Sequence, residues 1–341
     1  MRTRNLVAAG VLLGVPHVLV AFASFFAPYD HRLQDRSSPF APPTRVHFLD
    51  EDGRFHPRPF VYRSAERLDQ PGQYDEDRSE RYPLRFFVAD TPYGMSGSGA
   101  AHRLVGVDEP ARLFVLGSDG YGRDQLSRLL HGGRISLLAG LLAAVLALGV
   151  GLIVGTLAGF YGGWVDQAAM RSAELFLALP WLYLLFAVRA FLPLDLDPAH
   201  AFLVVVLVIG LIDWARPARL VRGVVLSARE RDYVLAARGF GASDRYLLIR
   251  HLLPEAAGVV LTQAALAVPQ YILAEVTLSF LGLGVGEPVP SWGNMLAALQ
   301  QYHVLASYWW MFLPGLALVP VFLGYQTLAE GLRERGPAVP L

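Results

Sequence analysis

The chain has 341 residues, of which 54% are hydrophobic and 17% are charged, and its mean hydropathy is +0.38. Residues 28–134 hold 15 Arg and 16 Asp or Glu, so the remaining 234 residues carry only 27 charges. That is about 12%, against the roughly 25% that is usual in soluble domains. The 29 basic and 29 acidic residues balance, which excludes the strong basic field of a nucleic-acid-binding protein.

Two residue types are missing altogether. All basic residues other than His are Arg, so the chain cannot contain a phosphate-binding GxxxxGK[ST] loop, which requires Lys. If ATP drives its work, that ATP is hydrolysed by another polypeptide. Cys is also absent, which excludes disulfides and thiolate chemistry.

Six apolar stretches approach the ~20 residues that a helix needs to cross a bilayer. We therefore predict an all-α integral membrane protein with six transmembrane helices, formed by residues 6–27, 135–160, 175–193, 199–215, 256–283 and 308–328. The first stretch follows Arg2 and Arg4 and resembles a signal peptide, with Ala21-Phe22-Ala23 as a cleavage site. Its 22 residues exceed the ~7 to 15 of a signal core, which favours an uncleaved anchor.

The arrangement of Arg predicts the orientation. With the N-terminus inside, the inner segments contain thirteen Arg and the short outer segments 194–198 and 284–307 contain none. This is the bias of the positive-inside rule, from which a long loop such as 28–134 is exempt. Both termini are therefore predicted to be cytoplasmic.

Gly151, Gly155 and Gly159 recur every fourth residue in the second apolar segment, and Gly163 follows at its exit. Residues four apart share a helix face, so the stripe indicates close approach of another backbone. The contact is either static helix packing or one that moves during transport.

The segment 216–255 is predicted to lie inside the cell, and it carries eight Arg. Tyr233, Ala236, Ala237 and Phe240 suggest one short helix, which Gly239 and Gly241 end, and Ser243 or Asp244 can cap a second. Such a helix-turn-helix fits a groove on another protein, whereas a basic segment resting on anionic headgroups is the alternative.

The sequence of this segment resembles the EAA loop of bacterial ABC-importer permeases. Residues 233–244 read YVLAARGFGASD and residues 251–254 read HLLP, so that Ala236, Ala237, Gly241, Leu253 and Pro254 match the pattern at its spacing. Leu235 replaces the Glu of the motif and His251 replaces its Ile. The resemblance implies that Ala236, Ala237, Arg238, Gly241, Ala242, Asp244, Leu253 and Pro254 couple the chain to an ATPase.

Further stretches resemble the C-type subunits of the dipeptide, oligopeptide and nickel permeases. They are LGSDGYGRDQLSRLL at 116–130, FYGGWVD at 160–166, LSFLGLGV at 278–285 and PSWGNML at 290–296. The resemblance covers most of residues 112–335. It implies the type I importer fold, two ATP-binding cassette subunits, a second homologous permease as heterodimer partner, an extracytoplasmic substrate-binding protein and a bacterial inner membrane.

Residues 28–134 form a large outer insertion. Short apolar runs at 59–62, 85–88 and 112–115 predict brief strands, hence a small β lobe. Ten Pro between residues 28 and 110 support the alternative of a disordered insertion.

Glu275 lies inside the fifth apolar segment, where a charge costs ~2.5 to 3.5 kcal/mol on insertion scales. We expect it to face the bundle interior, either lining the translocation path or hydrogen-bonding between helices. The family resemblance favours the path. The nine His show no HxxxH or HExxH spacing, so no metal site or cofactor is expected.

The expected organisation is an N-terminal helix (1–27), an outer insertion (28–134), a permease core (135–335) with the coupling loop 216–255, and a tail (336–341). The expected function is a non-enzymatic permease subunit of an ATP-driven importer of di- or oligopeptides. The alternatives are a nickel-chelate or modified-peptide permease, a non-conducting receptor or scaffold, and an ion-coupled carrier.

Overall fold

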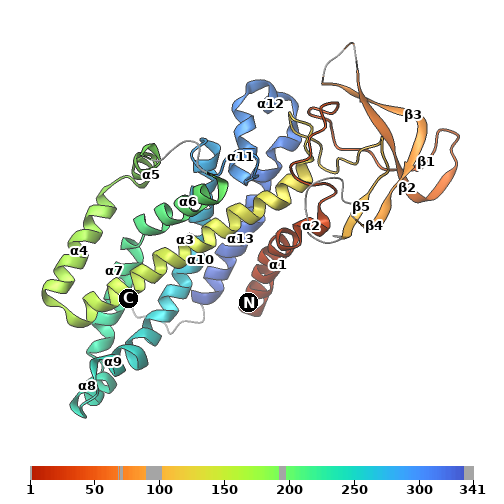
Figure 1. Ribbon diagram of the computed structural model, residues 1–341. Helices are drawn as coiled ribbons and strands as arrows, with labels where there is room; N and C mark the ends of the chain where they lie inside the picture. The colour runs from red at the N-terminus through yellow and green to blue at the C-terminus, as the bar shows by residue number, and fades with distance from the viewer. Residues whose placement is uncertain (1, 68, 70–71, 90–101, 192–196, 334–341) are drawn as a thin grey trace. The chain divides into compact units, whose positions relative to one another are not determined.

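The computed structural model describes residues 2–67, 69, 72–89, 102–191 and 197–333 (Figure 1). Its contacts divide the chain into two compact units. The first unit comprises Met1–Gly14, Leu137–Leu278 and Val319–Leu341, and the second comprises Val15–Ser136 and Ser279–Leu318. The expected tail at 336–341 lies outside the described residues.

The first unit is helical. It contains all or part of α1 (Arg2–Ala21), α3 (Gln125–Tyr161), α4 (Gly163–Ala178), α5 (Trp181–Ala190), α6 (Pro198–Ile212), α7 (Ala215–Arg229), α8 (Asp232–Gly239), α9 (Asp244–Leu247), the π-helical turn η1 (Leu248–Leu252), α10 (Leu253–Phe280) and α13 (Leu313–Arg333).

Within the described residues, three helical stretches are long and apolar enough to cross a membrane: Gln125–Tyr161, Asp244–Phe280 and Trp309–Arg333. A fourth span results if Pro198–Ile212 and Ala215–Arg229, which are bent by 42°, are counted together. Asn5–Ala21 is a shorter apolar helix. The described residues are thus largely helical, with up to four stretches that could cross a membrane, and the count of six spans stays a prediction.

The predicted helix at 175–193 is not continuous. Leu179, which precedes Pro180, is extended (φ −82°, ψ 132°) and separates α4 from α5. A residue before proline is disfavoured in the α region because the proline Cδ crowds its backbone. The apolar count alone misses this break.

Pro254 lies inside a continuous helical stretch. It is the second residue of α10, directly after the π turn η1, and the chain remains helical to Phe280. Inside a helix, proline lacks the N–H that the backbone ladder requires, and a local π adjustment such as η1 can satisfy the freed backbone groups.

The second unit contains two antiparallel sheets (Figure 1). The first has the order β1–β2–β3, and the second pairs β4 with β5. The strands are β1 (His47–Leu49), β2 (Phe55–Glu66), β3 (Tyr74–Pro83), β4 (Arg85–Ala89) and β5 (His102–Gly106). A small core of Val61, Tyr82, Leu84, Ala111 and Leu113 holds this region together.

The expected strands at 59–62 and 85–88 lie within β2 and β4. The expectation for 112–115 is wrong, because this segment belongs to no strand. Its apolar residues Leu113 and Phe114 are buried by packing instead. No strand was predicted at β3, because its sequence, YDEDRSERYP, is almost entirely polar.

The rest of the second unit includes α2 (Ala23–Phe26) and a compact segment after α10. That segment contains α11 (Trp292–Ala297), the 3₁₀ turns η2 (Ala298–Gln300) and η3 (Trp309–Phe312), and α12 (Tyr302–Ser307). Ser291 caps α11 in a reciprocal capping box with Asn294. The indole N–H of the buried Trp292 donates to the Leu129 carbonyl at 2.9 Å.

Candidate functional site

The segment expected to contact an ATPase is a helix pair with a tight elbow. α8 ends in a Schellman motif, in which the Ala242 N–H donates to the Ala237 carbonyl and the Gly241 N–H to the Arg238 carbonyl, both at 3.0 Å. Gly241 has φ +83°, a left-handed conformation that side chains with a Cβ disfavour. Ser243 then caps α9 through the Tyr246 N–H at 3.3 Å. The local sequence therefore dictates the bend.

One side of this elbow packs on the first unit's core. Val234, Leu247 and Leu252 are fully buried, and they cluster with Phe160 of α3 and with Val221 and Val225 of α7. Ala237 and Ala242 pack against the same cluster. The Arg238 guanidinium lies 5.6 Å from the centre of the Phe160 ring. The elbow is thus joined by apolar packing to the ends of two longer helices.

The base of the elbow is held by polar contacts. Glu255 accepts a hydrogen bond from Arg231 at 3.0 Å and one from the Tyr233 hydroxyl at 2.9 Å. His251, which replaces the motif's Ile, contacts the rings of Tyr233 and Tyr246 at 5.6 and 5.5 Å. The imidazole of His251 is thus packed against two aromatic rings.

The elbow also presents apolar side chains to solvent: Leu235, Phe240, Tyr246 and Ile249. Phe240, at the tip, is 93% exposed. Leu235 stands where the motif has Glu, so this surface gains apolar area and lacks a carboxylate. Among the other expected coupling residues, Leu253 is half-buried and Ala236, Arg238, Gly241, Asp244 and Pro254 are exposed.

The glycine stripe of α3 lies against α7. A Cβ on Gly151 would lie 2.8 Å from the ring of Pro217, and one on Gly155 only 2.4 Å from the Ala218 carbonyl oxygen. A Cβ on Gly159 would lie 2.9 Å from Val225. Gly163 begins α4 with φ +55° and has open space around it, so it belongs to the turn and not to this contact.

Two polar links that the sequence analysis did not identify reinforce the same region. Arg222 of α7 forms a bidentate ion pair with Asp166 of α4. Arg229 donates to the Gly159 carbonyl at 3.0 Å. In the sequence, Asp166 stood out only as the last residue of the family-like stretch FYGGWVD at 160–166. Its partner lies 56 residues away, on a helix that was expected to be a loop.

Glu275 is fully buried within α10. It is therefore an interior side chain, as expected from the cost of exposing a carboxylate to hydrocarbon. Leu253 and Glu275 lie on the same helix, about 33 Å apart along its axis at ~1.5 Å per residue.

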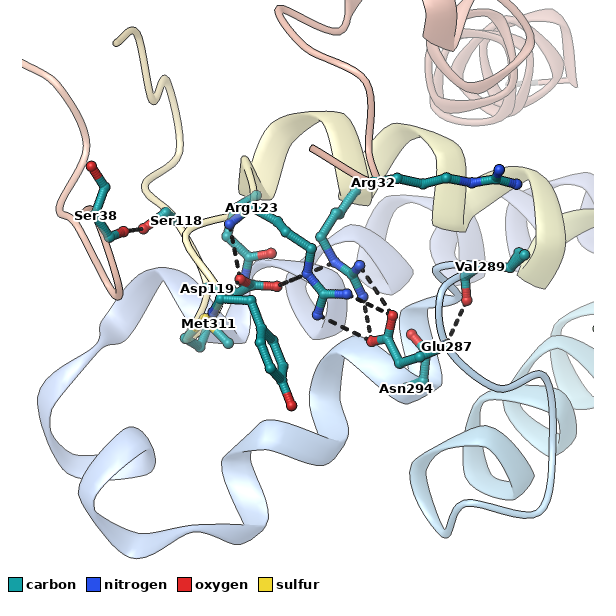
Figure 2. Close-up of polar contacts among 12 residues, drawn as sticks. Arg32, Ser38, Ser118, Asp119, Arg123, Glu287, Val289, Asn294 and Met311 are labelled. Carbon is teal, nitrogen blue, oxygen red and sulfur yellow. Dashed lines mark hydrogen bonds and ion pairs between the residues drawn. The ribbon is translucent and has the colours of Figure 1, made fainter. Parts of the chain in front are cut away.

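A cluster of four charged side chains in the second unit joins the family-like stretch 116–130 to Glu287, which lies on the loop between the stretches 278–285 and 290–296 (Figure 2). Arg123 donates to Glu287 at 2.7 and 3.2 Å, and Arg128 donates to the same carboxylate at 2.8 and 3.4 Å. Asp119 accepts from Nε of Arg123 at 2.7 Å and lies 3.5 Å from Nε of Arg128. The sequence analysis assigned none of these residues a role.

Burial within this cluster is uneven. Arg123, Arg128 and Asp119 are buried, whereas the Glu287 side chain is 48% exposed. Burial tends to raise the pKa of Glu287, but the guanidiniums of Arg128 and Arg123 hold this pKa below its ordinary value. Glu287 is therefore a carboxylate that faces solvent on one side and two buried cations on the other.

The neighbouring Asp124 is more deeply buried. Its Oδ2 accepts from the Ser127 N–H at 2.7 Å and from the Ser127 hydroxyl at 2.6 Å. Burial raises the pKa of Asp124 to about 7, against the opposing effect of the Ser127 hydrogen bonds. This carboxyl group therefore changes charge near neutral pH.

Strands β2 and β3 border a polar hollow of about 680 Å³. It is lined by Arg45, Tyr62, Tyr74, Glu76, Arg78 and Trp309, among others. Across the described residues, no group of three or more His, Asp or Glu side chains is arranged to hold a metal ion.

Comparison with known proteins identifies the chain's relatives. Residues 151–335 match the family described as "Binding-protein-dependent transport system inner membrane component". This match includes the elbow, the glycine stripe and Glu275. The crystal structure of an amino acid ABC transporter with histidines aligns with 61% of this chain and 94% of its own, at 16% identity and a TM-score of 0.45, too low for residue-level comparison.

Several curated proteins are similar over a longer range. A "Putative peptide permease protein" of Brucella ovis is 40% identical over 254 residues, covering 74% of this chain and 82% of the relative. The dipeptide transport system permease protein of Alkalihalophilus pseudofirmus is 33% identical, covering 69% and 74%. The oligopeptide transport system permease protein of Escherichia coli K12 is 39% identical, covering 64% and 70%. The chain therefore belongs to the family of inner membrane components of binding-protein-dependent ABC transport systems.

Proposed function

We propose that this chain is a permease subunit that carries peptides inward across the bacterial inner membrane, driven by ATP hydrolysis on separate subunits. The peptide substrate is supported by the names of the relatives, which describe peptide, dipeptide and oligopeptide systems. The absence of Lys, and with it of a phosphate-binding loop, requires the ATPase to be another polypeptide.

The observation that carries the proposal is the exposed apolar side of the elbow. Leu235, Phe240 and Ile249 face solvent on a short helix pair whose other side is anchored in the core. Exposed apolar patches are typical of surfaces that bind another protein, and these three residues all lie within the elbow or the π turn that follows it. An ATPase groove that closes over Phe240 would bury an aromatic anchor of the kind that dominates binding energy.

The proposed coupling follows the packing. Movement of the elbow acts on Phe160 of α3 and on Val221 and Val225 of α7, because Val234 and Leu247 pack directly against them. It also acts along α10, since the helical chain from Asp244 to Phe280 is uninterrupted. We assign Glu275, buried on that helix, to the translocation path. The helices would alternate between outward and inward openings as the ATPase subunits close and separate.

The expected partners follow from the same role. They are two ATP-binding cassette subunits, a second homologous permease chain that completes the pathway, and an extracytoplasmic substrate-binding protein. The thirteen Arg in the predicted inner segments support a topology with both termini and the elbow in the cytoplasm.

Phe240→Asp tests the docking surface. Because Phe240 is 93% exposed, this change leaves the chain's own packing intact, but it places a charge where the ATPase would bury an aromatic ring. We expect the variant to insert into the membrane normally, to lose co-purification with the ATPase, and to lose ATP-driven peptide uptake. Ala237→Arg, which disturbs the packing against Phe160, should also abolish uptake.

Tyr302→Asp is the matched control. Tyr302 is an aromatic residue of similar exposure, 81%, in the segment predicted to lie outside the cell. It should retain its ATPase. If Phe240→Asp keeps both the ATPase and uptake, the coupling role of the elbow is wrong. A non-conducting receptor would bind its external partner without any ATP-dependent uptake, and an ion-coupled carrier would respond to an ion gradient instead.

A further inference from the structure

The charged cluster at the start of α3 has the features of a carboxylate-binding site. Arg123 and Arg128 present four guanidinium N–H groups to one carboxylate, at 2.7 to 3.4 Å. Paired guanidinium contacts of this kind are the usual means by which proteins recognise carboxylates. In this structure the carboxylate is the chain's own Glu287 (Figure 2).

The two acidic members of the cluster are held very differently. Asp119 is buried and accepts from the backbone N–H groups of Tyr121 and Arg123 at 2.8 and 3.0 Å, in addition to its contact with the Arg123 side chain. Glu287 is half exposed and is held by the two Arg side chains. Asp119 is therefore a fixed part of the site, whereas Glu287 occupies its open side.

The backbone around Glu287 does not depend on the side chain. The Asn294 amide donates to the Val285 carbonyl at 3.1 Å and to the Val289 carbonyl at 2.8 Å, and so fixes the loop on both sides of Glu287. Rotation of the Glu287 side chain into solvent would leave these loop contacts in place.

Charge balance requires that the position be filled. Without Glu287, two buried guanidiniums would face Asp119 alone, and an uncompensated buried charge is strongly destabilising. A carboxylate from a ligand that takes the place of the Glu287 side chain would keep the two guanidinium charges neutralised. The open side also borders an aromatic ring, because Tyr121 is exposed and lies 4.7 Å from the Arg123 guanidinium.

We propose that Arg123 and Arg128 bind the C-terminal carboxylate of the transported peptide, and that Glu287 fills this site until the peptide replaces it. The exposed ring of Tyr121 would contact the last residue of the peptide. The proposal rests on the peptide substrate proposed above and adds a recognition site for one end of that substrate.

Glu287→Gln tests it by removing the competing charge while keeping the shape of the side chain. Uptake of trialanine and of trialanine amide, which lacks the terminal carboxylate, is measured with the complete transporter and its binding protein. We expect the ratio of kcat/KM for trialanine to kcat/KM for trialanine amide to be roughly tenfold higher in the variant than in wild type. A tenfold change corresponds to about one charge-assisted hydrogen bond. The binding protein's own preference is common to both transporters and cancels.

Glu109→Gln is the matched control, because Glu109 is an exposed acid in the same unit that lies 3.7 Å from Arg112. Its ratio should equal that of wild type. A second measurement follows the purified complex itself: trialanine should raise the apparent melting temperature of Glu287→Gln, and trialanine amide should not. If Glu287→Gln does not fold, Glu287→Asp keeps the charge on a shorter side chain and should raise the ratio by a smaller factor.

The outcomes separate the two proposals. An unchanged ratio in a transporter that still imports trialanine overturns the carboxylate site and leaves the peptide function standing. A change in the binding protein's affinity for the transporter, with the ratio unchanged, would assign Arg123 and Arg128 to an acidic side chain of that protein and would likewise overturn the proposal. Failure of the wild-type transporter to import either peptide refutes the proposed function itself.

Discussion

Gly155→Ala is the most direct test of the contact between α3 and α7. The added Cβ would lie 2.4 Å from the Ala218 carbonyl oxygen and 2.9 Å from the Val221 Cβ. Ordinary contact begins near 3.4 Å, so the two helices must separate locally by about 1 Å. Neither neighbouring atom is the end of a flexible side chain, and the strain cannot be relieved by a rotamer change.

Overpacking of this kind costs typically ~1 to 3 kcal/mol. In proteins of about 150 to 250 residues each kcal/mol lowers the melting temperature by roughly 2 to 4 °C, and the shift becomes smaller as the chain becomes longer, so a decrease of at most a few degrees per kcal/mol is expected here. The measurement is thermal unfolding of the detergent-purified transporter, together with its ATP-driven uptake at a temperature well below the transition.

Gly149→Ala supplies the control, since it makes the same chemical change on the same helix where no atom lies within 4 Å of the new Cβ. It should melt like wild type. Equal melting of all three proteins would refute the close contact. A Gly155→Ala variant that is destabilised but transports normally indicates static packing, whereas loss of uptake beyond the loss of stability indicates that the contact moves during transport.

Two further predictions concern single residues. Gly241→Ala should destabilise the elbow by ~1 to 2 kcal/mol because residue 241 has a positive φ, and it should thereby reduce ATPase co-purification and uptake. Gly239→Ala is the control, because residue 239 has no positive φ and a new Cβ there would have no atom within 4 Å. Equal behaviour of the two variants would contradict the Schellman motif. Asp124 is expected to stabilise the fold in its protonated form, because its pKa is raised from 3.8 to about 7 in the folded chain. The stability that it contributes is therefore present below pH ~4 and is lost as the pH rises toward 7. The melting temperature of wild type minus that of Asp124→Asn should therefore fall between pH 5 and pH 7.5, and a pH-independent difference would show that Asp124 is ionised throughout.

The features that the sequence predicted correctly are those with local causes. The elbow bends where Gly241 supplies a left-handed residue and Ser243 supplies a cap, and both signals lie within a few residues of the turn. The long apolar runs at 135–160 and 256–283 lie largely within α3 and α10, since continuous apolar sequence favours a helix in a membrane.

The features that were missed depend on burial from outside the segment. α7 carries Arg at 216, 219, 222 and 229, and the segment was expected to be part of the inner loop 216–255. Its apolar face becomes visible only when Val221 and Val225 are seen packed on α3 and on the elbow. β3 is a polar strand stabilised by pairing with β2, so neither its composition nor its alternation indicates a strand.

The charged cluster of Asp119, Arg123, Arg128 and Glu287 could not be predicted either, because Glu287 is far from the other three members in the sequence. Arg123 and Arg128 lie in a recognisable stretch, but the carboxylate that balances them is 164 and 159 residues away. No periodicity or local spacing relates positions so far apart, and counting Arg in the outer loops ignores an isolated Glu. A buried guanidinium nevertheless requires a nearby anion. Two Arg that become buried therefore predict a carboxylate partner, and Glu287, on the loop between two other family-like stretches, is the residue that the fold supplies.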